Sequence, residues 1–183
     1  MQLNVIHNIL RRERFQTLLD ERDTQGLDLV LWPAIMDAQR PFVGICRAHK
    51  QIVRWAKQTG LREVCIGEDD LKFLAPGAWW YFLDQKPKDF DIYLGGVFHG
   101  HIAPDNSITD WCGMTLYIVR ERFYDTFLNL NEANNLDREL ANKGRYLVCD
   151  RMVCSQHPGY SDHKAQYVDD YDHYLEGRNL YSI

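Results

Sequence analysis

The chain has 183 residues, of which 45% are hydrophobic, and its formal net charge is −5. This length and apolar content fit one domain over residues 1–183, and the negative charge argues against nonspecific binding to nucleic acid or membranes. Five widely spaced cysteines predict no disulfide framework, and no apolar run has the length of a membrane span or the order of a signal peptide. We therefore expect a cytoplasmic protein without a membrane span, and leave peripheral membrane association open.

Strands and helices alternate over the first seventy residues. Strands are predicted at residues 3–9, 27–35 and 62–67, and helices at 11–21 and 44–59. Phe15, Leu18 and Leu19 form an apolar stripe at helical spacing, Pro33 stops the second strand, and Gly60 closes the second helix. This alternation predicts an α/β fold with a mostly parallel central sheet flanked by helices.

The second half of the chain predicts shorter elements. Helices are expected at residues 75–85 and 135–144, strands at 89–98 and 145–156, and a strand followed by a helix over 112–130. Residues 157–183 are polar, aromatic and weakly patterned, so we expect a tail or an arm packed on the surface. Most of the 10 Tyr and 5 Trp should belong to the core or its rim, with stacking on a ligand as the alternative for some.

Three adjacent carboxylates follow the third strand: Glu68, Asp69 and Asp70. Like charges repel, and partial burial makes the repulsion worse. In α/β folds, ligands gather at the carboxyl ends of strands. Mg²⁺ and Mn²⁺ suit such a cluster, because they take few protein carboxylates and complete their shell with water and substrate phosphates. The alternative is a solvated turn in which Asp69 or Asp70 caps a helix or makes an Asx-turn.

Residues 44–73, GICRAHKQIVRWAKQTGLREVCIGEDDLKF, resemble the core of the family-twenty-five glycosyltransferases. That family includes bacterial lipopolysaccharide glycosyltransferases and collagen galactosyltransferases. Gly44, Ala48, His49 and the carboxylates at 68–70 fall at matching places, although the family usually has Ser where this chain has Ala48. Weaker similarity at residues 6–14, 113–122 and 136–138 extends the resemblance over most of residues 3–162. The chain is short for the family, so the acceptor region is expected to be reduced.

The resemblance implies a single GT-A-like domain that binds a nucleotide-sugar through Mn²⁺ or Mg²⁺. It also implies an inverting reaction, in which a base removes a proton from the acceptor hydroxyl and the metal supports the departing nucleoside diphosphate. We therefore predict a metal-dependent glycosyltransferase that moves a sugar to a glycan or another hydroxyl acceptor, with lipopolysaccharide biosynthesis as one setting.

The expected metal ligands come from the acidic cluster. Asp70 is the first choice, while Glu68 and Asp69 either join it or meet the ribose or a metal-bound water. His157 is a candidate further ligand, because GT-A enzymes often complete the metal site with a late histidine. We expect His49, on an apolar helical stripe, to be structural and to brace the turn at residues 68–70.

Residues for the nucleotide and for the proton transfer lie elsewhere in the chain. Asn8, Arg11 and Arg14 are candidates for the nucleotide, since Arg offers paired N–H donors to a diphosphate; an exposed first helical turn is the alternative for the arginines. Asp137, at the start of a predicted helix, is the first candidate for the general base, with a helix cap as its alternative. Asp110 is the reserve candidate.

Two other functions are compatible with the sequence. A sugar nucleotidyltransferase on a similar sheet is one, but such enzymes open with a glycine-rich loop and residues 8–16 contain no glycine. A catalytically silent module that binds a glycan or a partner protein is the other. Metal-dependent hydrolysis of a nucleotide-sugar would separate an active site from a silent one.

Overall fold

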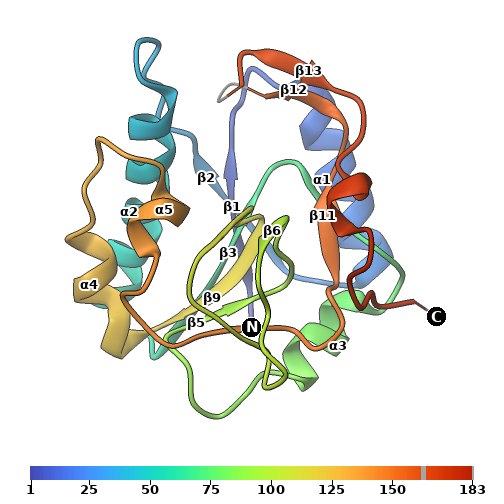
Figure 1. The fold of residues 1–183 in the computed structure, drawn as a ribbon. Helices are drawn as coiled ribbons and strands as arrows, with labels where there is room; N and C mark the ends of the chain where they lie inside the picture. Colours follow the sequence, from blue (N-terminus) through green and yellow to red (C-terminus); the bar gives the residue numbers. More distant parts are fainter. Residues whose placement is uncertain (162–163, 183) are drawn as a thin grey trace.

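A seven-stranded sheet crosses the centre of the domain in the computed structural model, which describes residues 1–161 and 164–182 (Figure 1). The strand order is β2-β1-β3-β9-β5-β10-β7. The strands are β1 (Leu3–His7), β2 (Leu29–Pro33), β3 (Glu63–Glu68), β5 (Ile92–Leu94), β7 (Ser107–Ile108), β9 (Leu116–Arg120) and β10 (Tyr146–Val148). Five of the seven run in one direction, and β9 and β7 run against them. The predicted α/β fold with a mostly parallel sheet is confirmed.

Helices cover both faces of this sheet. They are α1 (Arg12–Gln25), α2 (Pro41–Gln58), α3 (Ala78–Asp84), α4 (Tyr124–Leu128) and α5 (Leu136–Leu140). In Figure 1, α2, α4 and α5 lie on one side of the sheet and α1 and α3 on the other. Strand β3 serves both sides, because its side chains alternate: Val64 and Ile66 pack toward α2, while Cys65 packs toward α1 and α3.

The first three strands lie together as predicted. β1 pairs in parallel with β2 and with β3, with Leu3 opposite Leu29 on one side and Cys65 on the other. Helix α2 begins at Pro41, three residues before the predicted start, and Pro is well suited to a first helical position. A Cβ atom at Gly44 would lie 2.1 Å from the carbonyl oxygen of Ile35, so the start of α2 packs directly against the loop that follows β2.

The second half differs from the predicted elements in three places. Of the strand predicted at 89–98, only β5 forms. The strand predicted at 145–156 divides into β10 and β11 (Cys154–Gln156). Between them the chain is irregular, and the N–H groups of Cys149 and Val153 bond to the carbonyl oxygens of Leu94 and Gly95. The helix predicted at 135–144 is only α5. Helix α5 ends because the ψ of Ala141 is 128° and the φ of Asn142 is 59°, and neither angle is compatible with a right-handed helix.

Short paired strands complete the fold. Three pairs form: β4 (Leu71–Phe73) with β11, β6 (His99–Gly100) with β8 (Trp111–Cys112), and β12 (Gly159–Ser161) with β13 (Gln166–Val168). Single 3₁₀ turns are η1 (Glu121–Phe123) and η2 (Asp172–Leu175).

The C-terminal segment packs onto the domain. Tyr171 and Leu175 are buried, and Met152 bridges to Leu180. Figure 1 shows the β12–β13 hairpin at the edge of the sheet where β1 ends. Within the described ranges 1–161 and 164–182, we find no helix with the length and apolar character needed to cross a bilayer.

Candidate active site

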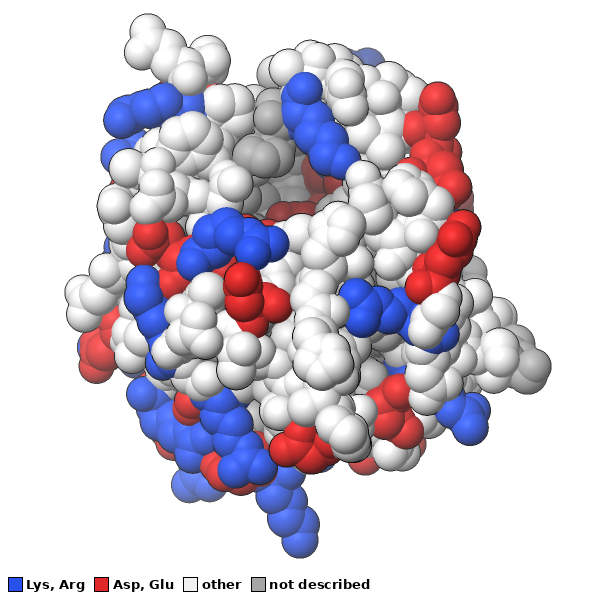
Figure 2. All heavy atoms as spheres, in the orientation of Figure 1, with Lys and Arg blue, Asp and Glu red and all other residues white. Residues whose placement is uncertain are grey.

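A cleft of about 760 Å³ opens at the carboxyl edge of the sheet. Its walls come from the ends of β1 and β3, the loop at residues 34–38, the first half of α2, the start of α5 and the C-terminal segment. Parallel pairing brings the carboxyl ends of β1, β2 and β3 to the same edge, which is why residues distant in sequence meet there. Figure 2 shows the hollow, with acidic side chains at its base and a basic side chain along its rim.

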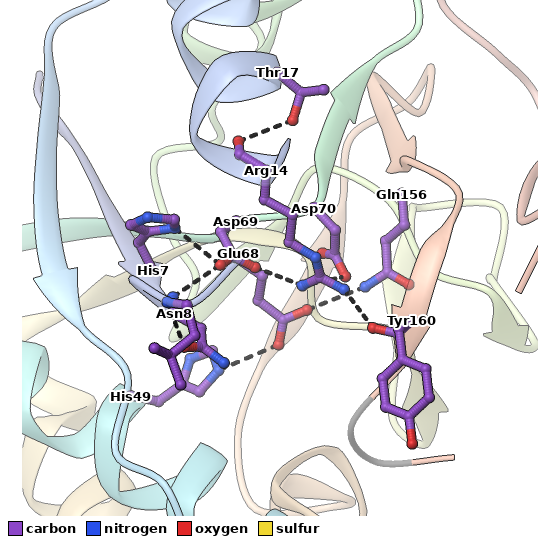
Figure 3. Close-up of polar contacts among 11 residues, drawn as sticks. His7, Asn8, Arg14, Thr17, His49, Glu68, Asp69, Asp70, Gln156 and Tyr160 are labelled. Carbon is purple, nitrogen blue, oxygen red and sulfur yellow. Dashed lines mark hydrogen bonds and ion pairs between the residues drawn. The ribbon is translucent and has the colours of Figure 1, made fainter. Parts of the chain in front are cut away.

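Asp69 is fully engaged with neighbouring groups at the base of the cleft. Its Oδ2 accepts hydrogen bonds from the backbone N–H of Asn8 (2.9 Å) and lies 3.0 Å from Nδ1 of His7, while Oδ1 lies 2.5 Å from Nη1 of Arg14 (Figure 3). Its side chain is only 6% exposed. These contacts tie the turn after β3 to the end of β1 and the start of α1.

Asp70 is the buried carboxylate of this cluster whose hydrogen bonding is incomplete among the described residues. It is 8% exposed, its Oδ2 lies 3.3 Å from Nη1 of Arg14, and its Oδ1 has no hydrogen-bond partner among the described residues. Burial, aided by the negative charge of Glu68, raises the pKa of Asp70 to about 8. A buried carboxylate oxygen without a partner is costly, so this atom is suited to a cation.

Glu68 is held by two side chains at the edge of the cleft. His49 places Nε2 3.4 Å from its Oε1, and Gln156 donates to its Oε2 at 3.1 Å. His49 is itself fixed, because its Nδ1 lies 2.6 Å from the hydroxyl of Tyr117. His49 is buried and contacts Glu68, as expected of a residue that braces the acidic turn, by which we mean residues 68–70; it also lines the cleft.

The residues around Asp70 fit a hard divalent cation. Asp70 offers an unpaired carboxylate oxygen and Glu68 a second, partly exposed carboxylate, which matches the one or two carboxylates that Mg²⁺ takes beside substrate phosphates. Asp69 is already engaged with three donors. Over the parts of the chain that the structure describes, no group of three or more His, Cys, Asp or Glu is arranged to hold a metal, so a cation here would need ligands from substrate and water.

Arg14 links the acidic turn to the C-terminal hairpin. Its Nη1 contacts Asp69 and Asp70, and its Nη2 donates to the backbone oxygen of Tyr160 at 2.8 Å (Figure 3). The surrounding carboxylates raise the pKa of Arg14 despite its burial, so it stays charged. Asn8 and Arg14 both line the cleft, whereas Arg11 lies outside its lining and stacks over the ring of Tyr160 at 4.8 Å.

Asp137 lies on the opposite wall of the cleft, at the start of α5. Its Oδ2 accepts the N–H of Gly113 at 3.3 Å and its Oδ1 the N–H of Arg138 at 2.8 Å. Burial raises the pKa of Asp137, and the charge of Glu68 adds to the rise. Gly113 has a φ of 94° and packs against the ring of Phe98, so this wall is close-packed.

Besides Arg11, two more predicted residues lie outside the cleft lining. His157 points to α1, where its Nε2 lies 3.0 Å from Oε1 of Glu21, although its backbone N–H bonds to the oxygen of Asp70. Asp110 is an exposed residue that forms an ion pair with Arg138 at 2.7 Å. In both cases a partner outside the cleft lining or on the exposed surface engages the side chain: Glu21 for His157 and Arg138 for Asp110.

The sequence did not indicate the contribution of the C-terminal segment. Gln156, Tyr160, Lys164, Tyr171 and Tyr174 all line the cleft. Their only sequence signal is the density of tyrosines after residue 159, which is equally typical of a surface arm.

Comparison with known proteins gives a likeness of fold. No protein-family model matches the chain, and no curated protein matches its sequence. Among solved structures, A197 from STIV aligns over 100% of this chain and 98% of its own, with a TM-score of 0.56 and 9% identity. HddC from Yersinia pseudotuberculosis aligns over 81% of this chain and 69% of its own, with a TM-score of 0.49 and 10% identity. A mutant Drosophila β1,4-galactosyltransferase 7 in complex with manganese, UDP-Gal and xylobiose aligns over 100% of this chain and 75% of its own, with a TM-score of 0.43 and 12% identity. At 9% identity the alignment with A197 shows a common fold only, and the other two alignments are weaker still.

Proposed function

We propose that this protein is a metal-dependent glycosyltransferase with a GT-A-like fold that uses a nucleotide-sugar donor. The observation that carries the proposal is Asp70, a buried carboxylate in the lining of a cleft of about 760 Å³, whose Oδ1 accepts no hydrogen bond from any described residue. A cleft of that volume is large enough for a small-molecule ligand such as a nucleotide-sugar. The similarity of residues 44–73 to family-twenty-five glycosyltransferases supports the same assignment and favours an inverting enzyme of glycan synthesis, such as that of lipopolysaccharide.

In this proposal, Asp70 and Glu68 would hold Mn²⁺ or Mg²⁺. The bound ion would neutralise charge on the leaving nucleoside diphosphate. Asp69 positions Arg14, which supplies a second positive charge beside the same site. His49 and Gln156 keep Glu68 directed into the cleft.

Asp137 is the proposed general base. It accepts the proton of the acceptor hydroxyl as the acceptor oxygen forms a bond to the anomeric carbon and the bond from that carbon to the diphosphate breaks. Its raised pKa suits this role, because a base works best when its pKa approaches the operating pH. Its partners Gly113 and Arg138 donate only backbone N–H groups, and these fix the carboxylate on the wall facing the acidic turn.

A panel of nucleoside diphosphates and nucleotide-sugars, with and without Mn²⁺, tests the proposal. Binding should raise the melting temperature by mass action, and slow hydrolysis should release nucleoside diphosphate only when metal is present. Asp70→Asn should remove both effects, while Asp84→Asn, at an exposed end of α3, should keep them.

Each other result assigns a different function. Pyrophosphate release from a nucleoside triphosphate and a sugar phosphate would identify a nucleotidyltransferase. Binding of a glycan without any nucleotide effect would identify a silent binding module.

A further inference from the structure

We propose that Arg14 competes with a divalent cation for Asp70, so that cation binding loosens the β12–β13 hairpin. The hairpin contributes Tyr160 and Ser161 to the lining of the cleft, and its loosening opens that wall when the cation binds. The inference rests on the cation site of the proposed function and concerns the regulation of that site. Arg14 is in this view a positioning residue, which acts on the wall of the cleft through Tyr160.

Arg14 holds the acidic turn and the hairpin with one charged group. Its Nη1 lies 2.5 Å from Oδ1 of Asp69 and 3.3 Å from Oδ2 of Asp70. Its Nη2 donates a hydrogen bond of 2.8 Å to the backbone oxygen of Tyr160, so the guanidinium lies between the two segments (Figure 3). The side chain is only 16% exposed, and water therefore screens these contacts little. A change of charge at the acidic turn reaches the hairpin through this side chain.

The two oxygens of Asp70 allow a second cation to approach. Oδ2 is in contact with Arg14, whereas Oδ1 accepts no hydrogen bond from any described residue. Two positive charges on one carboxylate repel each other, and the repulsion is stronger in a buried site than in water. Since a divalent ion carries twice the charge of a guanidinium, its binding weakens the attraction between Asp70 and Arg14.

The hairpin is an element that can respond to this change. β12 and β13 form a two-stranded sheet of their own, and none of their six residues, all of which the structure describes, is buried. Besides the bond from Arg14, the guanidinium of Arg11 lies 4.8 Å from the ring centre of Tyr160, and the ammonium of Lys164 lies 5.5 Å from that of Tyr171. Segments with few buried apolar contacts open locally at a low cost in free energy. Weakening one charge-assisted hydrogen bond therefore changes how often the hairpin opens.

Hydrogen exchange of the full chain with and without Mn²⁺, followed by mass spectrometry at neutral pH, tests the inference. Mn²⁺ alone should make the amides of β12 and β13 exchange about fivefold faster, which is less than complete loss of a charged hydrogen bond would give. The amides of α4, which contributes no residue to the cleft lining, are the internal reference. Asp70→Asn should abolish the effect of Mn²⁺, and Asp84→Asn, at an exposed end of α3, should keep it.

Titration calorimetry with Mn²⁺ alone measures the reciprocal effect, because a coupling free energy acts equally on both partners. Arg14→Gln removes the competing charge and should bind Mn²⁺ about tenfold more tightly than the wild type. A purely structural Arg14 predicts the opposite sign, because an acidic turn without its clamp would hold the ion less well. Arg54→Gln, on the exposed side of α2, is the matched control and should bind Mn²⁺ as the wild type does.

Three results would overturn the inference: absence of Mn²⁺ binding, slower or unchanged exchange of the hairpin in the Mn²⁺-bound wild type, and weaker binding by Arg14→Gln. The wild-type comparison needs no variant, so it decides the question even if Arg14→Gln does not fold. These measurements also separate the inference from the proposed function, because they use no nucleotide. Normal nucleotide binding with an unresponsive hairpin would refute this inference alone, whereas a responsive hairpin in a chain that binds no nucleotide would refute the proposed function alone.

Discussion

The guanidinium of Arg14 lies 3.3 Å from one carboxylate oxygen of Asp70, and the other oxygen is buried and has no hydrogen-bond partner among the residues that the structure describes. One guanidinium therefore satisfies only half of a buried carboxylate. The same guanidinium holds Asp69 and the backbone of Tyr160, so the acidic turn and the C-terminal hairpin share a single positive group.

Asp70 should make the metal-free protein less stable as pH rises. Its pKa is about 8 in the folded protein and about 3.9 in an unfolded chain. Between these values the folded state binds a proton that the unfolded state has released, so the free energy of unfolding falls with increasing pH. At pH 8 without metal, Asp70→Asn should be the more stable protein by about 1–3 kcal/mol, the usual cost of an unsatisfied buried group. At pH 4 the two should be equal.

Differential scanning calorimetry across this pH range checks the expectation. Mn²⁺ should stabilise the wild type at pH 8 and leave Asp70→Asn unaffected. Identical pH dependence in the two proteins would mean that Asp70 is not the titrating group.

Arg14→Lys should release the hairpin. Lysine keeps the charge but has a single nitrogen, which cannot reproduce the forked contacts to Asp69 and to the oxygen of Tyr160. Hydrogen exchange of the amides in β12 and β13 should become about tenfold faster, as expected for the loss of roughly 1.4 kcal/mol from a charged hydrogen bond. Arg54→Lys, on the exposed side of α2, serves as the control. Unchanged protection of the hairpin would show that other contacts hold it.

Asp137→Asn should lower turnover by about 10²–10⁴-fold, the usual contribution of a positioned base, and leave donor affinity nearly intact. Turnover should fall as pH is lowered, because the base must lose its proton before it can act. Since the pKa of Asp137 is raised, this fall should occur at a higher pH than an ordinary aspartate would give. Melting temperature, donor affinity and turnover are measured on the same variant. Normal turnover with a loss of about 1 kcal/mol in stability would instead make Asp137 a residue that stabilises the start of α5.

Gln156→Leu should weaken Mn²⁺ binding about tenfold by freeing the carboxylate of Glu68, since residues that orient metal ligands are typically worth 10–100-fold in affinity. Titration calorimetry with Mn²⁺ and a nucleoside diphosphate measures the change. Gln58→Leu, at the exposed end of α2, should bind as tightly as the wild type. Equal affinity in all three proteins would argue that Glu68 is not a ligand.

The local pattern of the first seventy residues determined their fold. Apolar runs and helical spacing, with Pro33 and Gly60 as stops, predicted strands and helices that the structure contains at nearly the same places. The acidic turn was predictable for the same reason: a buried strand that ends in three carboxylates marks an edge of the sheet. The bracing role of His49 followed from its place on the apolar face of α2.

Only the tertiary structure decided how the three carboxylates differ. Asp69 is engaged by His7, Asn8 and Arg14, which lie more than fifty residues away in sequence, whereas one oxygen of Asp70 receives no donor from the described parts of the chain. The wall formed by the C-terminal segment, the Glu21 partner of His157 and the burial of Asp137 likewise depend on long-range packing. Spacing along a chain predicts which residues share a face of one element, whereas hydrogen bonds and burial depend on which elements meet.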